Sequence, residues 1–163
     1  MSLAPLMSSA KQDWRTPKAL FDTLSSMAGG FNLDAAADSS NTLCDVFFSE
    51  RYSAFDHNWD VWPETRAFLN PPYGKALARF SLRAVEQVSL ERRKVEVWML
   101  VPARVDTRWW NLMITKAVSV RFMAGRVKFE REDGARDAAP FPTAVIQLRH
   151  DGGNPSVVWG WRP

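Results

Sequence analysis

The sequence predicts an α/β fold built on one sheet with antiparallel strands at its edge. Segments with strand-like and helix-like patterns alternate along most of the 163-residue chain. The segment VEVWMLVPA at 95–103 is almost entirely apolar, as in a strand that is covered on both faces. Two strand-like runs, TAVIQLR at 143–149 and SVVWGW at 156–161, follow each other at the end and favour a closing hairpin.

A helix is predicted to start at Thr16-Pro17. Thr16 is a suitable capping residue, and Pro17 suits the first helical position. Gly29 and Gly30 are expected to end the helix. The apolar residues that repeat at helical spacing between these limits are Leu20, Phe21, Leu24 and Met27.

The next segments predict two short strands that end in polar residues. FNLDAAAD at 31–38 reads as a strand that ends at Asp34. Residues 38–65 have no clear period and predict loops and turns, and residues 66–69 are apolar enough for a second strand. Residues 75–93 follow a helical pattern with one apolar face. Because the strands alternate with a helix, their carboxyl ends should meet at one edge, where α/β sheets bind ligands.

The second half of the chain predicts one more helix and several strands. Thr107 is expected to cap a helix that carries two tryptophans. VSVRFM at 118–123 and GRVKFER at 125–131 are strand-like, and residues 132–142 read as a loop.

Composition indicates a globular protein of a reducing compartment. The chain is 46% hydrophobic and 24% charged, with no apolar run long enough to span a bilayer. Cys44 is the one cysteine, and the amino-terminal residues do not resemble a secretory signal, so we expect a cytoplasmic location. His57 and His150 lie in no zinc-binding spacing, and we expect no metal. Residues 1–12 are expected to be frayed, and residues 13–163 to form a single domain.

Positive charge is concentrated in the second half of the sequence. Residues 1–90 contain 8 basic and 10 acidic side chains, whereas residues 91–163 contain 13 basic and 8 acidic ones. An arginine-rich half favours an anionic partner, with nucleic acid first among the candidates. Charge alone favours a solvated surface without a partner equally well.

The stretch FLNPPYG at 68–74 is the most informative motif in the chain. A residue before proline is excluded from the helical region, so Asn70 and Pro71 are held extended, and Pro72 fixes its own φ. The Asn70 side-chain oxygen and the Pro71 carbonyl are two acceptors on a stiff frame, which suits a group that carries an NH2. Tyr73 adds a flat ring on which a planar group could stack. Hydrogen bonds to both hydrogens of an amine would free its lone pair and direct it toward an electrophile.

Two simpler interpretations of the motif are available. Pro-Pro after asparagine is a common way to leave a strand, and PPxY also occurs in ligands of WW domains. A ligand motif should lie in an exposed, disordered segment, but apolar elements flank this one. We therefore favour a catalytic role in methyl transfer to an NH2 group.

The motif NPPY resembles the signature of amino-methyltransferases that use S-adenosylmethionine. Together with its neighbours it resembles the phage-type, Dam-like family of DNA N6-adenine methyltransferases, over nearly all of residues 12–149. The ordered segments that carry the resemblance are DWRTP at 13–17, FNLDAAAD at 31–38, Asn41, FLNPPYG, VPARVDTRWW at 101–110, GRVKF at 125–129 and PFPTAV at 140–145.

The resemblance implies a Rossmann-like methyltransferase sheet, reduced in size, that acts on an adenine flipped out of double-stranded DNA. It implies that Asn70 and Pro71, supported by Pro72, accept hydrogen bonds from adenine N6 while Tyr73 stacks on the base. The residues expected to bind the cofactor S-adenosylmethionine are Thr16, Pro17, Asp34, Ala35, Ala36 and Asp56.

The chain departs from the pattern of many methyltransferases in two respects. Ala35-Ala36-Ala37 stands where many have a glycine-rich loop, and the chain has no room for a separate target-recognition domain. Either loops should therefore read the bases, or the recognition site should be short. The basic residues expected to contact the DNA are Arg104, Arg108, Arg126, Lys128, Arg131 and Arg136.

Two other functions fit parts of the sequence. Protein-glutamine methyltransferases carry a similar tetrapeptide, because a side-chain amide also offers an NH2. A catalytically silent nucleic-acid-binding module could retain the same fold. An NTPase is excluded as a serious candidate because no GxxxxGK motif is present.

Overall fold

The computed structural model describes residues 14–92 and 94–163. The expectation for residues 1–12 therefore lies outside the described residues, and the single-domain interpretation stays a prediction. The elements in chain order are α1 (Lys18–Ala28), β1 (Leu33–Asp34), β2 (Glu64–Leu69), α2 (Lys75–Ser89), β3 (Lys94–Pro102), α3 (Arg108–Ile114), β4 (Ala117–Met123), β5 (Lys128–Glu130), β6 (Arg136–Ala138), β7 (Thr143–Leu148) and β8 (Ser156–Trp161).

The predicted α/β class is confirmed, with a mixed sheet at its centre. Six strands follow the order β1-β2-β3-β7-β4-β8, and β5 pairs with β6 in a separate two-stranded sheet. β1, β2 and β3 are parallel, and β8 is parallel to β4. β7 is antiparallel to both of its neighbours, β3 and β4. The carboxyl ends of β1, β2 and β3 therefore meet at one edge.

The predicted closing hairpin and antiparallel edge strands are wrong. β7 lies inside the sheet, and β8 passes it to form the edge beside β4. Burial gives the physical reason, because Thr143–Ile146 of β7 are buried, as an internal strand requires. Ser156–Gly160 of β8 are exposed, with Trp159 at 75% of its full accessibility, as an edge position allows.

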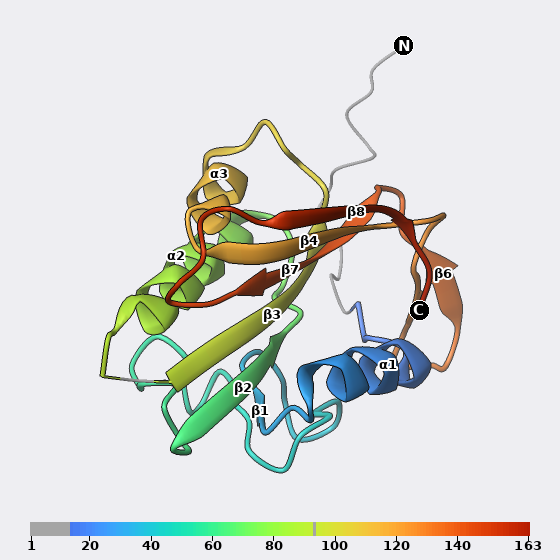
Figure 1. The fold of residues 1–163 in the computed structure, drawn as a ribbon. Helices are drawn as coiled ribbons and strands as arrows, with labels where there is room; N and C mark the ends of the chain where they lie inside the picture. The colour runs from blue at the N-terminus through green and yellow to red at the C-terminus, as the bar shows by residue number, and fades with distance from the viewer. Residues whose placement is uncertain (1–13, 93) are drawn as a thin grey trace.

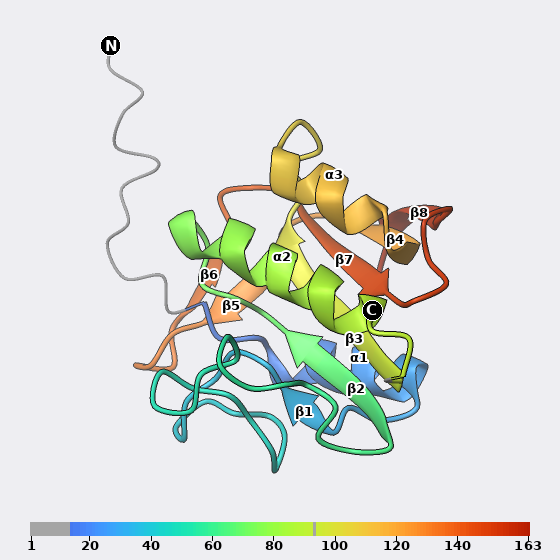
Figure 2. The same cartoon turned by 90° about the vertical axis from the view of Figure 1, so that its left-hand side faces the viewer.

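The helices cover both faces of the sheet (Figures 1 and 2). α2 and α3 pack side by side on one face, and α1 lies on the other. Phe21 of α1 meets Phe68 of β2 edge-on, with the ring centroids 5.2 Å apart. None of the described helices has the length and apolar character needed to cross a membrane.

Local signals in the sequence set most element boundaries. Thr107 caps α3 as predicted, because its hydroxyl accepts a hydrogen bond from the Trp110 backbone N–H. Gly29 ends α1 with a φ of 76°, a left-handed conformation that favours glycine. Thr16 does not cap α1: the helix starts at Lys18, its N-cap is Pro17, and no side chain caps it.

The predicted loop 132–142 contains the short strand β6, whose backbone pairs with β5. The helix predicted over 75–93 ends at Ser89. Neither difference affects β1 or β2, which are parallel, so their carboxyl ends lie at the same edge.

The long segment between β1 and β2 is fixed by a buried tryptophan. Trp59 is fully buried, and its backbone N–H donates to Gln87 Oε1 of α2 at 2.8 Å. Its ring Nε1–H donates to the Ala54 carbonyl, also at 2.8 Å. Phe47 of the same segment forms a parallel bridge with Asp34, on the side of β1 that faces away from β2. The segment is thus held at several points although it contains no long element.

Replacing Trp59 with alanine should lower the free energy of unfolding by about 3–5 kcal/mol, because it leaves a cavity and removes the hydrogen bond from the ring Nε1–H to the Ala54 carbonyl. Trp62 offers a matched control, since it lies three residues away and is 49% exposed. Trp62→Ala should cost about 1 kcal/mol or less. Urea denaturation followed by circular dichroism measures both, and similar losses would contradict the anchoring role of Trp59.

Candidate active site

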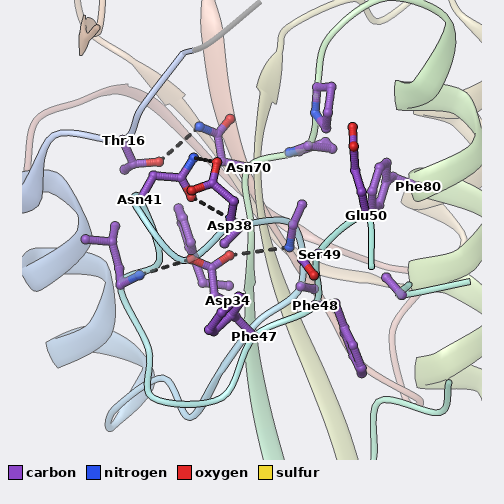
Figure 3. A pocket seen from close by; sticks show the side chains of 18 of the residues that line it. Thr16, Asp34, Asp38, Asn41, Phe47, Phe48, Ser49, Glu50, Asn70 and Phe80 are labelled. Atoms are coloured by element: carbon purple, nitrogen blue, oxygen red, sulfur yellow. Dashed lines mark hydrogen bonds between the residues drawn. The ribbon is translucent and has the colours of Figure 1, made fainter. Parts of the chain in front are cut away.

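A pocket of about 1330 Å³ opens at the carboxyl ends of β1 and β2 (Figure 3). Its walls come from residues 14–16, the turn 34–38, parts of the loop 39–55 and the corner 70–72, with Ala76 and Phe80 of α2 and Glu132 near β5. Single small molecules usually occupy about 300–1000 Å³. The pocket therefore has room for two molecular groups side by side.

Asn70 projects from the corner and is held by its amide nitrogen. Nδ2 donates to the Trp14 carbonyl oxygen at 2.6 Å and to Thr16 Oγ1 at 3.0 Å (Figure 3 draws the second bond). Asn70 Oδ1 is buried and has no hydrogen-bond partner among the described residues. Leaving such an atom without a partner costs about 1–3 kcal/mol, so native proteins rarely do it. This oxygen is an acceptor that a ligand N–H group can satisfy.

The corner that carries Asn70 is rigid for reasons visible in the sequence. Leu69 and Pro71 are buried on either side of it. Gly74 has a φ of 98°, which side chains other than glycine rarely adopt, and α2 starts at the next residue. The two prolines and the glycine thus turn the chain from β2 into α2 within a few residues.

Tyr73 does not line the pocket, although the sequence suggested a ring available for stacking. Its side chain is buried, and its hydroxyl donates to the Leu100 carbonyl at 3.2 Å. Phe129 and Phe141 pack against the ring edge-on, with centroids 6.1 and 5.4 Å away. In this structure Tyr73 supports the corner from the protein interior. Stacking of its ring on a base stays a prediction.

Asp34 ends β1 and is 4% exposed on the pocket wall. Oδ2 accepts a hydrogen bond from the Leu43 backbone N–H at 3.2 Å, and Oδ1 accepts one from Ala36 N–H at 3.4 Å. Burial raises the pKa of this carboxyl from 3.8 to about 6, and the two backbone donors oppose that rise. Asp34 therefore fixes the backbone at Ala36 and Leu43 through these two hydrogen bonds. Its carboxyl group is mostly ionised at pH 7.

Asp38 is a pocket residue to which the sequence analysis gave no role. Its carboxylate accepts hydrogen bonds from the Ser40 hydroxyl and backbone N–H, both at 2.6 Å, and from Asn41 Nδ2 at 3.2 Å. The Ser40 hydroxyl lowers the pKa of Asp38 below its usual range. The pocket thus contains, besides Asp34, a carboxylate that is ionised at neutral pH. The sequence feature that could have identified Asp38 is its position in FNLDAAAD, four residues after Asp34.

Phenylalanines form an apolar part of the pocket wall. Phe47, Phe48, Phe55 and Phe80 all line the pocket. The Arg79 guanidinium lies over the Phe55 ring, 3.9 Å from its centroid, and Phe80 packs against the same ring. Flat apolar side chains suit an aromatic ligand ring. Sequence reasoning missed this wall because three of its members lie in the segment without a clear period.

The predicted cofactor residues divide into two groups. Thr16, Asp34, Ala35 and Ala36 line the pocket. Pro17 and Asp56 are not among its lining residues. Pro17 precedes α1, and Asp56 is exposed in a turn where its backbone N–H donates to the Ser53 carbonyl. A turn-forming role accounts for Asp56.

The predicted DNA-contacting residues also divide into two groups. Arg104, Arg108, Arg126 and Lys128 are exposed, and none of them forms an ion pair with another described residue. Arg131 pairs with Asp133 and Asp137, each at 2.9 Å, and Arg136 pairs with Glu130 at 2.9 Å. Such exposed pairs contribute little stability, but they reduce the net positive charge of the β5–β6 hairpin.

Comparison with known proteins places the sequence in a family. The family model described as DNA N-6-adenine-methyltransferase (Dam) matches residues 4–162. The "DNA N-6-adenine-methyltransferase" of Escherichia phage T1 is 31% identical over 98 residues, which cover 60% of this chain and 39% of the phage protein. The Escherichia coli (strain K12) protein named "Putative methyltransferase YfdM" is 33% identical over 63 residues, or 37% of this chain and 69% of that protein. The chain thus spans well under half the length of the phage T1 relative.

The raised pKa of Asp34 predicts a specific dependence of stability on pH. The folded protein binds this proton more tightly than the unfolded chain does, so the Asp34 contribution rises as pH falls from about 7 to about 4. Relative to Asp34→Asn, which cannot titrate, the wild type should gain about 2.4 kcal/mol of unfolding free energy over that range. Urea denaturation of both proteins at several pH values measures the difference, in which the other carboxyls cancel. A difference that stays constant with pH would contradict it.

Proposed function

Because this chain belongs to the DNA N-6-adenine-methyltransferase (Dam) family, we propose that it transfers a methyl group from S-adenosylmethionine to the N6 amino group of adenine in double-stranded DNA. The single observation that best supports the proposal is the buried oxygen of Asn70, which lacks a partner at the wall of a large pocket. An exocyclic amine supplies the hydrogen that this oxygen can accept.

The residues of the corner would act on the amine itself. Asn70 Oδ1 accepts one hydrogen of N6, and the Pro71 carbonyl, held on the same stiff turn, accepts the other. These bonds draw the nitrogen away from conjugation with the ring and turn its lone pair toward the methyl donor. Pro72 limits the freedom of the turn, so the two acceptors keep their relative orientation.

The volume of the pocket supports binding of S-adenosylmethionine beside a flipped base. S-adenosylmethionine, when bound, supplies the electrophilic methyl group. Asp34 and Asp38 offer carboxylates to a cationic ligand, and the small side chains of Ala35 and Ala36 allow a close approach to the backbone. Thr16 also lines the pocket. The phenylalanine wall offers flat faces for an adenine ring.

Tyr73 has a more limited role in this scheme than its position in NPPY suggests. A stacking ring would have to leave its contacts with Phe129 and Phe141 and break the hydroxyl bond to Leu100. The buried ring supports the corner whether or not it also meets the base, so Asn70 is the sharper test of the mechanism.

We infer that the sheet is a reduced, Rossmann-like methyltransferase sheet contained in one domain over residues 13–163. The parallel order β1-β2-β3, with α2 between β2 and β3 and the pocket at their carboxyl ends, supports this assignment. Base recognition then falls to loops near the pocket. The single cysteine, Cys44, is consistent with a reducing compartment, and the phage T1 relative supports action in the cytoplasm of a bacterium or of a phage-infected cell.

Asn70→Ala should abolish most methylation, because it removes the acceptor for N6, while leaving S-adenosylmethionine affinity within about twofold. The assay supplies methyl-labelled S-adenosylmethionine with double-stranded DNA and maps the modified adenines, and calorimetry measures cofactor affinity. A glutamine-containing peptide serves as the competing substrate. Labelled peptide and unlabelled DNA would overturn the DNA assignment, and near-normal methylation by Asn70→Ala would overturn the role of the corner.

Removing an exposed positive charge just before β5 should weaken the salt dependence of DNA binding. Arg126→Ala should reduce the slope of log affinity against log salt by about 1 if that side chain meets a phosphate. Lys18→Ala is the control, since Lys18 lies on α1 and pairs with Asp22 at 2.7 Å. Fluorescence anisotropy of a labelled duplex over a salt series measures both slopes. An unchanged slope for Arg126→Ala would exclude a phosphate contact at this residue.

A further inference from the structure

We propose that Thr16 is a positioning residue for methyl transfer: its hydroxyl, together with the Trp14 carbonyl, fixes the Asn70 amide so that Oδ1 is the atom presented to the target amine. This inference rests on the proposed function of Asn70. It differs from the cofactor-binding role that the sequence suggested for Thr16, because the hydroxyl acts through another side chain.

The hydrogen-bond partners determine the orientation of the Asn70 amide. Its Nδ2 faces two oxygen atoms, the Trp14 carbonyl at 2.6 Å and Thr16 Oγ1 at 3.0 Å. A carbonyl oxygen can only accept, so turning the amide over would place Oδ1 against it without a hydrogen between them. The terminal torsion of asparagine is otherwise broad. Both bonds together therefore hold Oδ1 on the side away from residues 14–16.

The support for these two oxygens does not depend on a ligand. Arg15 and Glu130 exchange backbone hydrogen bonds of 3.0 and 2.9 Å, which tie the segment to β5. The Trp14 ring packs against Phe129 and Phe141, with centroids 5.4 and 6.3 Å away. Thr16 is only 8% exposed. The segment 14–16 is thus a fixed frame against which the Asn70 amide is set.

The same frame explains why residue 70 carries an amide. A carboxylate at this position would face the Trp14 carbonyl with no hydrogen to share, and only the Thr16 hydroxyl could donate to it. The amide instead uses both hydrogens on the frame and leaves its oxygen free of them. The frame therefore discriminates between asparagine and aspartate at the catalytic corner.

Thr16→Val tests the inference because it keeps the shape of the side chain and removes the hydroxyl, and Thr16→Ser is the matched control. We expect Thr16→Val to lower kcat about tenfold, as the loss of one orienting hydrogen bond would. The dissociation constants for S-adenosylmethionine and for duplex DNA should change by less than about twofold. Thr16→Ser should keep kcat within about threefold of the wild type. A weakened cofactor affinity with unchanged kcat would overturn the positioning role in favour of cofactor contact.

A second measurement follows the amide directly and needs no turnover. The side-chain NH2 signal of Asn70 in a ¹⁵N–¹H NMR spectrum is assigned by its disappearance in Asn70→Ala. In Thr16→Val this signal should shift and its hydrogens should exchange faster with water, whereas Thr16→Ser should retain the wild-type signal. An unchanged signal in Thr16→Val would overturn the inference.

The two proposals fail in distinguishable ways. If Asn70→Ala methylates DNA at a near-normal rate, the role proposed for Asn70 is wrong, and the positioning role falls with it. If Asn70→Ala is inactive while Thr16→Val keeps both its kcat and its amide signal, only the positioning role is wrong.

Discussion

The parallel pairing of β1 with β2 is the constraint on which the site depends. Leu33 lies opposite Ala67, and Asp34 lies opposite Phe68. This register brings the last residue of β1 level with the end of β2, so that Asp34 and Asn70 reach the same pocket from two strands. A shift by one residue would turn the side chains to the other face of the sheet. The buried positions on both strands oppose such a shift.

Local patterns in the sequence were sufficient for most elements and for the catalytic corner. The helical spacing from Leu20, the cap at Thr107 and the stiff dipeptide after Asn70 each report on a few neighbouring residues, and the structure contains the helices and the corner that they predicted. The resemblance to a known family rested on ordered motifs, and the family match covers nearly the same part of the chain. These signals are local in sequence, so they can be read without knowledge of the tertiary fold.

Features that depend on tertiary packing could not be read in the same way. The burial of β7 was visible as an apolar run, but its insertion between β3 and β4 depends on pairing across the whole sheet. The Tyr73 ring looked available beside two prolines, yet Phe129 and Phe141 enclose it from distant parts of the chain. Thr16 fitted a helix cap in the sequence, whereas its hydroxyl meets a side chain 54 residues away.

The position of β7 also has a consequence for biosynthesis. Among the described strands, β7 is the one that joins β1-β2-β3 to β4-β8. Its residues, Thr143–Leu148, leave the ribosome after both of its partners. Until then β3 lacks the partner that β7 provides, although Val97 and Met99–Val101 are fully buried in the finished sheet. Unpaired apolar strands are prone to aggregation, so the stage just before the last strands emerge is the one at which this sheet is most exposed to misfolding.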